Sequence, residues 1–218
     1  MRSETASFLA LGDSYTIGES VPPAWSWPRQ LVARLRNAGY RVDDPSIVAR
    51  TGWTTDELAA GIRERGLSGP FSFVSLLIGV NNQYRGKAPE EYRREFHALL
   101  DEAVALAGGE PDRVLVLSIP DWGVMPFAEG RDRRAIGSEI DRFNRVNREV
   151  SRQRGCRYVD ITGISREARE SSDLAADDGL HPSGDQYGKW VEEILPVVGK
   201  ILASQQGSGD GDPGGGGI

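Results

Sequence analysis

Short apolar runs alternate with longer segments of helical periodicity along most of this 218-residue chain. That alternation is typical of a parallel β-sheet covered by helices, because each connection between parallel strands is long enough to hold a helix. The pattern predicts strands at 7–13, about 41–48, 71–80, 113–119 and 156–161. It predicts helices at about 26–38, 54–65, 89–107, 138–154 and 184–204. We therefore expect an α/β fold with a doubly wound, five-stranded parallel sheet in a three-layer α/β/α sandwich.

The predicted helix at 89–107 indicates how these segments meet the sheet. Its apolar residues recur at helical spacing and form one stripe: Tyr92, Phe96, Leu99, Leu100 and Ala103. A chain of this length fits one large α/β domain, which we expect to span 1–206. The remaining segment, 207–218, reads GSGDGDPGGGGI, offers almost no side chain to bury, and is expected to be a flexible tail.

Charge and composition exclude several classes of partner. The chain has 32 Asp and Glu residues against 26 Lys and Arg residues, which disfavours binding to nucleic acid or to an anionic membrane surface. The partner is therefore expected to be a small molecule, and the oligomeric state stays open. No segment has the form of a signal peptide or the length of a membrane span, so we expect a cytoplasmic protein unless a leader was removed. The single cysteine, Cys156, cannot form an internal disulfide and is expected to be a buried free thiol.

A serine follows the first predicted strand. The stretch LALGDSYTIGE, 9–19, places Ser14 just past the end of the apolar run. In open α/β sheets ligands bind beside the carboxyl ends of the strands, which is where Ser14 is expected. Ser14 alone fits two roles: it could cap a short helix, or it could be a nucleophile.

A second segment favours the nucleophile role for Ser14. In DDGLHPSGDQYG, Asp178 and His181 are three residues apart and Pro182 favours a turn. One loop could therefore bring the Asp178 carboxylate to one imidazole nitrogen and leave the other nitrogen free as a base for the serine. The neighbouring Asp177 is the competing partner for this histidine.

Two other titratable residues are expected to play no part in this site. The only other histidine, His97, lies on the polar face of a predicted helix and is expected to face solvent. Asp160, at the end of the fifth predicted strand, is expected to cap its own turn. Two separated histidines and one cysteine predict no zinc site, and nothing in the sequence indicates a metal or another cofactor.

Two further strand ends could supply donors for an oxyanion. Gly52 follows the second predicted strand in ARTGWTTDEL, where the missing side chain leaves its N–H open to a ligand. Asn81 follows the third in LLIGVNNQYRG, where its amide group could reach inward. Each residue alone is equally consistent with an ordinary turn.

Taken together, these segments resemble the ordered blocks of the GDSL or SGNH hydrolase family. The blocks are GDSYTIG, the glycine of RTGWTT, GVNN and DGLH, and they span nearly the whole chain. The resemblance implies a flavodoxin-like sheet and a serine hydrolase with no cofactor. It implies that Ser14 is the nucleophile with Asp178 and His181, and that the N–H of Ser14 joins Gly52 and Asn81 in the oxyanion hole. The third block usually reads Gly-x-Asn-Asp, whereas this chain has Asn82, which keeps the size and loses the charge.

The substrate side is predicted from the connection at about 120–137. Its first half is apolar, and SIPDWGVMPF resembles a substrate-side loop of the family. We expect Trp122, Met125 and Phe127 to form one wall of an open acyl pocket, although the loop could instead bury its apolar residues under itself. The expected function is hydrolysis of short-chain esters of small soluble molecules through an acyl-enzyme. The alternatives are acyl transfer to an alcohol and ligand binding without turnover.

Overall fold

The computed structural model describes residues 5–207, and within them five strands form one parallel sheet. The strands are β1 (Phe8–Gly12), β2 (Ser46–Ala49), β3 (Phe73–Leu77), β4 (Val114–Leu117) and β5 (Arg157–Val159). Their order in the sheet is β2-β1-β3-β4-β5, and all four pairings are parallel. This order reverses direction at β1 and β3, which places the topological switch point between their carboxyl ends.

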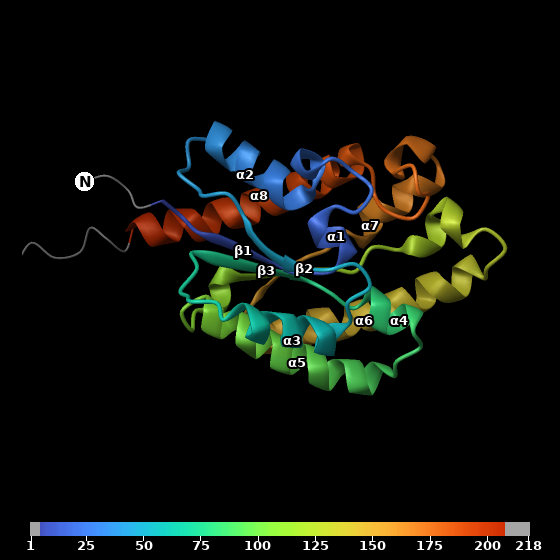
Figure 1. Ribbon diagram of the computed structural model, residues 1–218, viewed down its shortest axis with the longest axis horizontal. Helices are drawn as coiled ribbons and strands as arrows, with labels where there is room; N and C mark the ends of the chain where they lie inside the picture. Colours follow the sequence, from blue (N-terminus) through green and yellow to red (C-terminus); the bar gives the residue numbers. More distant parts are fainter. Residues whose placement is uncertain (1–4, 208–218) are drawn as a thin grey trace, which may run out of the picture.

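Helices cover both faces of the sheet (Figure 1). Helices α2 (Trp27–Asn37) and α8 (Gly184–Gly207) pack together on one face. Helices α3 (Thr55–Arg65), α5 (Pro89–Leu106) and α6 (Arg133–Arg154) cover the other. The expected three-layer α/β/α fold class is therefore confirmed.

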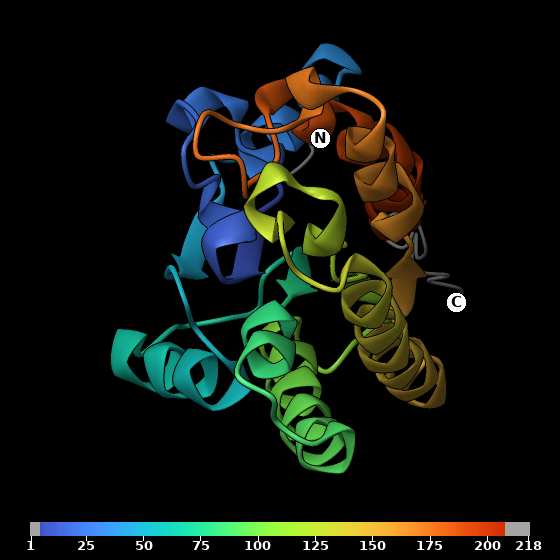
Figure 2. The same ribbon diagram turned by 90° about the vertical axis from the view of Figure 1, so that its right-hand side faces the viewer.

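Three short helices were not predicted, and all of them follow strands. They are α1 (Ser14–Ile17) after β1, α4 (Val80–Tyr84) after β3, and α7 (Thr162–Ser165) after β5. Figure 2 looks onto this carboxyl edge of the sheet, where these helices lie. Gly79, the residue before α4, has φ of 125°, a conformation that favours glycine, and a Cβ there would lie 2.4 Å from the Tyr92 hydroxyl oxygen. The chain therefore turns sharply into α4 at this position.

The two largest errors in the predicted boundaries have identifiable reasons. The second strand begins at Ser46 instead of near 41, because Pro45 has no N–H for the ladder. Helix α6 begins at Arg133 instead of 138, because Asp132 caps it: its carboxylate accepts from the backbone N–H groups of Arg134 and Ala135 at 3.1 and 2.9 Å. At the other end of the chain, α8 continues to Gly207, one residue past the predicted domain end. The rest of the predicted tail lies outside the described residues.

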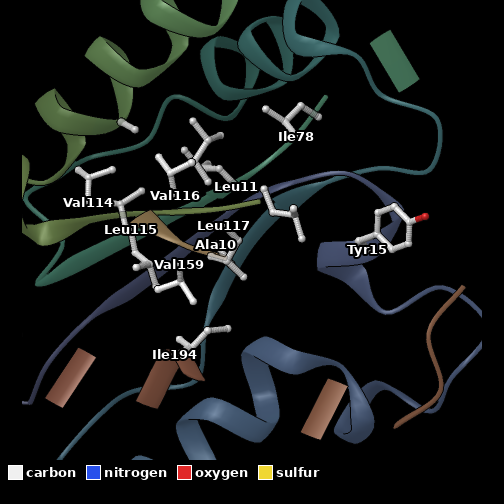
Figure 3. Packing of buried hydrophobic residues seen from close by; sticks show 14 of the residues in the cluster. Ala10, Leu11, Tyr15, Ile78, Val114, Leu115, Val116, Leu117, Val159 and Ile194 are labelled. Atoms are coloured by element: carbon white, nitrogen blue, oxygen red, sulfur yellow. The ribbon is translucent and has the colours of Figure 1, made fainter. Parts of the chain in front are cut away.

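The core lies between the sheet and both helix layers. Every residue of β1, β3 and β4 is buried, as expected for strands covered on two faces. Figure 3 shows the strand side chains on either side of the sheet, with Ile194 of α8 on one side and Ile78 on the other. A sheet held in this way fixes the carboxyl ends of its strands, and with them the residues that follow each strand.

Candidate active site

Ser14 is the first residue of α1, and Asp13 caps that helix. The Asp13 carboxylate accepts a hydrogen bond of 3.1 Å from the N–H of Tyr15. Burial, the largest influence, raises the pKa of Asp13 to about 7, although that hydrogen bond acts in the opposite direction. The capping alternative for Ser14 is therefore wrong, because its neighbour does the capping. No side-chain hydrogen bond within residues 5–207 uses the Ser14 hydroxyl.

His181 and Asp178 form the pair that their spacing predicted. The Nδ1 of His181 lies 2.5 Å from Oδ2 of Asp178. Oδ1 of the same carboxylate accepts from the backbone N–H groups of Leu180 and His181 at 2.9 and 3.0 Å. An ionised carboxylate can only accept, so the neutral imidazole carries its proton on Nδ1 and leaves Nε2 as the basic nitrogen. The Tyr15 ring packs against the imidazole in a T-shaped arrangement with centroids 5.6 Å apart, which fixes the imidazole further.

Ser20 also holds the Asp178 carboxylate, at the same oxygen that contacts His181, and sequence reasoning did not predict this residue. Its hydroxyl donates a hydrogen bond of 2.6 Å to Oδ2 of Asp178. Ser20 adopts φ of 64°, an uncommon conformation for serine. Partial burial acts to raise the pKa of Asp178, but the hydrogen bonds from His181, Ser20 and the loop backbone together hold that pKa well below its usual range. Asp178 therefore stays ionised wherever the imidazole can act as a base.

Gly52 and Asn81 lie on adjacent turns that are joined by a hydrogen bond. The amide Nδ2 of Asn81 donates to the carbonyl oxygen of Trp53 at 3.0 Å. An amide nitrogen has two protons, so this bond orients the group and leaves one proton for a ligand. Gly52 has φ of 82°, and its carbonyl oxygen accepts from Arg85 at 2.6 Å. Two residues of the α4 segment, Asn81 and Arg85, thus hold the turn after β2.

A pocket of about 190 Å³ at the carboxyl edge brings the predicted residues together. Its lining consists of Ser14, Tyr15, Val80, Asn81, Tyr84, Trp122, Phe127, Leu180 and His181. Gly52 is not among the lining residues and reaches the site only through the turn it shares with Trp53. Tyr84 lies three residues after Asn81 on α4, so helical spacing could have predicted its place in the pocket.

The loop after β4 divides between pocket and interior. Trp122 lines the pocket, and its indole N–H donates to Gln83 at 2.8 Å. Phe127 also lines the pocket and is 41% exposed. Met125 does not line it, contrary to the expectation: this side chain is buried with Val124 in a separate apolar cluster. Both interpretations of the loop therefore hold in part, because Trp122 and Phe127 line the pocket whereas Val124 and Met125 lie in the interior.

Asn82 is fully buried, and its neutral side chain, in place of the usual aspartate of the third block, joins a hydrogen-bond network. Its Oδ1 accepts from the backbone N–H of Thr55 at 3.1 Å, at the start of α3. Its Nδ2 donates to the Thr55 hydroxyl at 2.7 Å and to Glu95 at 3.3 Å. The Thr55 hydroxyl in turn donates to the same Glu95 carboxylate. The negative charge that the family pattern places at this position is therefore supplied here by Glu95 from α5.

The structure places the remaining candidates outside the pocket. His97 is half exposed on α5, beside Asp101. Asp160 accepts from the N–H of Thr162 and so caps its own turn. Cys156 is buried, and desolvation raises the pKa of its thiol to about 12. Across residues 5–207 no group of three or more His, Cys, Asp and Glu side chains could hold a metal ion, and no helix is long and apolar enough to cross a membrane.

The sheet order and the residues at its carboxyl edge define an SGNH-type hydrolase fold. The model of the GDSL-like lipase/acylhydrolase family matches residues 10–189. The chain therefore belongs to the GDSL-like lipase/acylhydrolase family, a class of carboxylic ester hydrolases. No curated protein matches the sequence.

Solved structures with the same fold cover most of this chain. TesA is 20% identical, with a TM-score of 0.70, over 89% of this chain and 99% of its own. The esterase EstA from Pseudoalteromonas sp. is 16% identical, with a TM-score of 0.69, over 90% and 98%. The acetyl xylan esterase Axe2 from Geobacillus stearothermophilus is 20% identical, with a TM-score of 0.67, over 89% and 96%. At these identities the likeness establishes the fold.

Proposed function

We propose that the protein hydrolyses short-chain carboxylic esters through an acyl-enzyme on Ser14. The observation that carries this proposal is the 2.5 Å contact between Asp178 and His181, together with the shared pocket of His181 and Ser14. A serine hydroxyl is a weak nucleophile until a base accepts its proton. The oriented imidazole is the group in this pocket that can do so.

In the first half-reaction the Ser14 oxygen attacks the ester carbonyl while its proton passes to Nε2 of His181. The carbonyl oxygen becomes an oxyanion, which the backbone N–H of Ser14 and the free amide proton of Asn81 stabilise. The imidazolium then gives its proton to the departing alcohol, which leaves an ester between Ser14 and the acyl group. Asp178 stabilises the positive imidazolium throughout.

In the second half-reaction a water molecule replaces the alcohol. Nε2 of His181 takes a proton from this water, whose oxygen attacks the acyl carbonyl. Collapse of the second oxyanion breaks the bond to Ser14, and the serine recovers its proton from the imidazolium. The products are a carboxylic acid and an alcohol.

The pocket volume supports short acyl groups. About 190 Å³ is smaller than the roughly 300–1,000 Å³ of sites for drug-sized ligands. Axe2 is described as an acetyl xylan esterase, and the EstA structure is described as inhibited by monoethylphosphonate. Both descriptions are consistent with a small acyl pocket and a reactive serine.

A fluorophosphonate probe tests the proposal, because it reacts only with an activated serine. Peptide mass spectrometry is expected to find the probe on Ser14, and Ser14→Ala is expected to abolish labelling. An unlabelled wild-type protein that remains folded would identify a binding protein without turnover. Product analysis with competing alcohols separates hydrolysis from acyl transfer, and we expect the free acid as the main product.

A further inference from the structure

Three aromatic rings at the rim of the pocket surround one guanidinium group. The guanidinium carbon of Arg131 lies 5.6 Å from the ring centroid of Tyr84, 5.4 Å from that of Trp122 and 5.2 Å from that of Phe127. These distances are within the range of cation–π attraction. All three rings line the pocket that holds Ser14 and His181. Tyr84 and Phe127 are also partly exposed, so Arg131 lies where the pocket meets solvent.

Arg131 has no carboxylate partner within residues 5–207. Its one side-chain hydrogen bond goes to the Tyr84 hydroxyl oxygen at 3.5 Å. The nearby Arg85, by contrast, forms an ion pair with Glu57 at 3.3 Å. Several other arginines also lack an ion pair, so the feature that distinguishes Arg131 is the set of three pocket rings around its guanidinium group. A guanidinium has five N–H donors, so most of those on Arg131 remain free for a ligand.

The rings also restrict where this guanidinium can lie. A free arginine side chain loses conformational entropy when it binds a ligand, which weakens binding. Arg131 is already held between Tyr84 and Phe127, and Trp122 is itself tethered by its hydrogen bond to Gln83. The positive charge is therefore preorganised beside the pocket. A planar guanidinium with free donors matches the geometry of a carboxylate.

We propose that Arg131 is a specificity-determining residue that selects esters carrying a carboxylate on the part of the substrate that projects past Trp122 to the pocket rim. This inference rests on the proposed ester hydrolysis at Ser14, and it names the class of substrate. A cationic ester is disfavoured, because Arg131 already occupies the space between the rings and repels a second positive charge.

The first experiment places the charge on the alcohol half of the ester. Hydrolysis of 4-acetoxybenzoate is compared with that of its neutral counterpart 4-acetoxybenzamide and of the cationic 4-acetoxyphenyltrimethylammonium. Each rate is measured for the wild type, Arg131→Gln, Arg131→Lys and the control Arg134→Gln, an exposed arginine of the same segment. Ratios of variant to wild type for one substrate cancel the intrinsic reactivity of that ester.

The second experiment places the charge on the acyl half. Monomethyl glutarate is compared with methyl glutaramate, which has the same shape without the charge, and acid release is followed in a pH-stat. The half of the substrate whose charge responds to Arg131→Gln is the half that faces the rim. Binding of the products 4-hydroxybenzoate and 4-hydroxybenzamide is measured by calorimetry as well, because this comparison does not depend on turnover.

Arg131→Gln is expected to lower kcat/KM for an anionic ester on the order of 10-fold, mainly through KM, since one charged hydrogen-bonding group is lost. Neutral esters should change less than about twofold, Arg131→Lys should recover part of the loss, and Arg134→Gln should have no effect. Equal losses on all esters, no loss on either anionic ester, or a gain confined to the cationic ester would each overturn the proposal. If the wild type hydrolysed no ester, the proposed function would fail, and the calorimetric preference for 4-hydroxybenzoate would still decide the role of Arg131.

Discussion

The backbone N–H of Phe127 donates a hydrogen bond of 2.9 Å to the carbonyl oxygen of Gly179. This bond joins the loop that lines the pocket to the loop that carries Asp178 and His181. Pro126 packs against the same glycine, where an added Cβ would lie 3.2 Å from the proline side chain. The pocket wall and the imidazole are therefore fixed relative to each other, and a lid-like opening of this wall would pull on the histidine loop.

A fixed, open wall predicts a preference for short acyl chains. Each buried CH₂ contributes about 0.8 kcal/mol, and that gain should stop after the first few carbons in so small a pocket. Rates on soluble esters are expected to peak between acetyl and hexanoyl, with no increase at a lipid interface. Phe127→Ala or Trp122→Ala should shift the preferred chain length. Rates that climb steadily to palmitoyl esters would show that a deeper channel exists.

Activation of Ser14 by a neutral imidazole predicts the response to pH. A general base acts in its neutral form, so activity is expected to be higher near neutral pH than in acid. The ionised state of Asp178, whose pKa is held well below its usual range, should not limit the rate. Ser14→Ala should abolish hydrolysis without a change in the melting temperature, and His97→Ala should retain both. Rate against pH and thermal unfolding of the purified variants provide the measurements. Undiminished hydrolysis by Ser14→Ala would rule out its assignment as nucleophile.

Asn81 should act mainly in the transition state. Its free amide proton meets a full negative charge only when the oxyanion forms, so its loss should appear in kcat more than in KM. Asn81→Ala is expected to lower kcat on the order of 10²-fold, as for other single oxyanion donors. A loss confined to KM would instead mean that Asn81 contacts the ground-state substrate.

Asn82 and Glu95 should be coupled in stability. Asn82→Asp would replace an amide donor with a second carboxylate beside Glu95, so it is expected to lower the free energy of unfolding by on the order of 3 kcal/mol at pH 8. Glu95→Gln alone should cost less, and the double variant should recover most of the loss. Urea unfolding of all four proteins forms the double-mutant cycle. Additive effects would show that the two side chains do not interact.

The buried Asp13 predicts a stability change with pH. The pKa of Asp13 is about 7 in the folded protein, whereas the ordinary value, which applies to the unfolded chain, is 3.8. The folded state therefore binds this proton more tightly than the unfolded state does. The resulting stability is present in full below pH 4 and is lost as pH rises through 7. The difference of about three pH units corresponds to about 4 kcal/mol.

Asp13→Asn keeps an oxygen for the N–H of Tyr15 and has no proton to lose. The variant should therefore match the wild type near pH 4 and exceed its melting temperature at pH 8. Asp43→Asn, at an exposed position, is the control and should follow the wild type at both pH values. Parallel curves for Asp13→Asn and the wild type would show that Asp13 titrates normally.

The layers of the fold could be predicted from sequence, because apolar periodicity reports directly which faces are buried. The ends of helices and strands were harder to predict where a single side chain determines them, as Asp132 does for α6 and Pro45 does for β2. Short helices such as α1 have too few residues to show any period. Their positions depend on the strands that precede them.

The site was predictable to the extent that chemistry depends on residue type and order, which is why Ser14, Asn81 and His181 could be placed in one pocket. Residues whose role depends only on a contact in the folded protein show no pattern in the sequence that could predict that role. Ser20 reaches Asp178 across 158 positions in sequence. Met125 and Phe127 are two apart in one apolar run, and only the path of the backbone sends one inward and the other to the pocket.

The hydroxyl of Thr55 has one proton, and it donates this proton in a hydrogen bond to the Glu95 carboxylate. A chain with aspartate at 82 and glutamate at 95 would require that proton to serve two carboxylates at once. The two positions can therefore change in one order and not in the other. Glu95→Gln can come first, while Asn82 still donates to its neighbours, and Asn82→Asp can follow. The opposite order passes through an intermediate in which two adjacent carboxylates compete for one hydroxyl proton, so the present pair restricts how this part of the sequence can evolve.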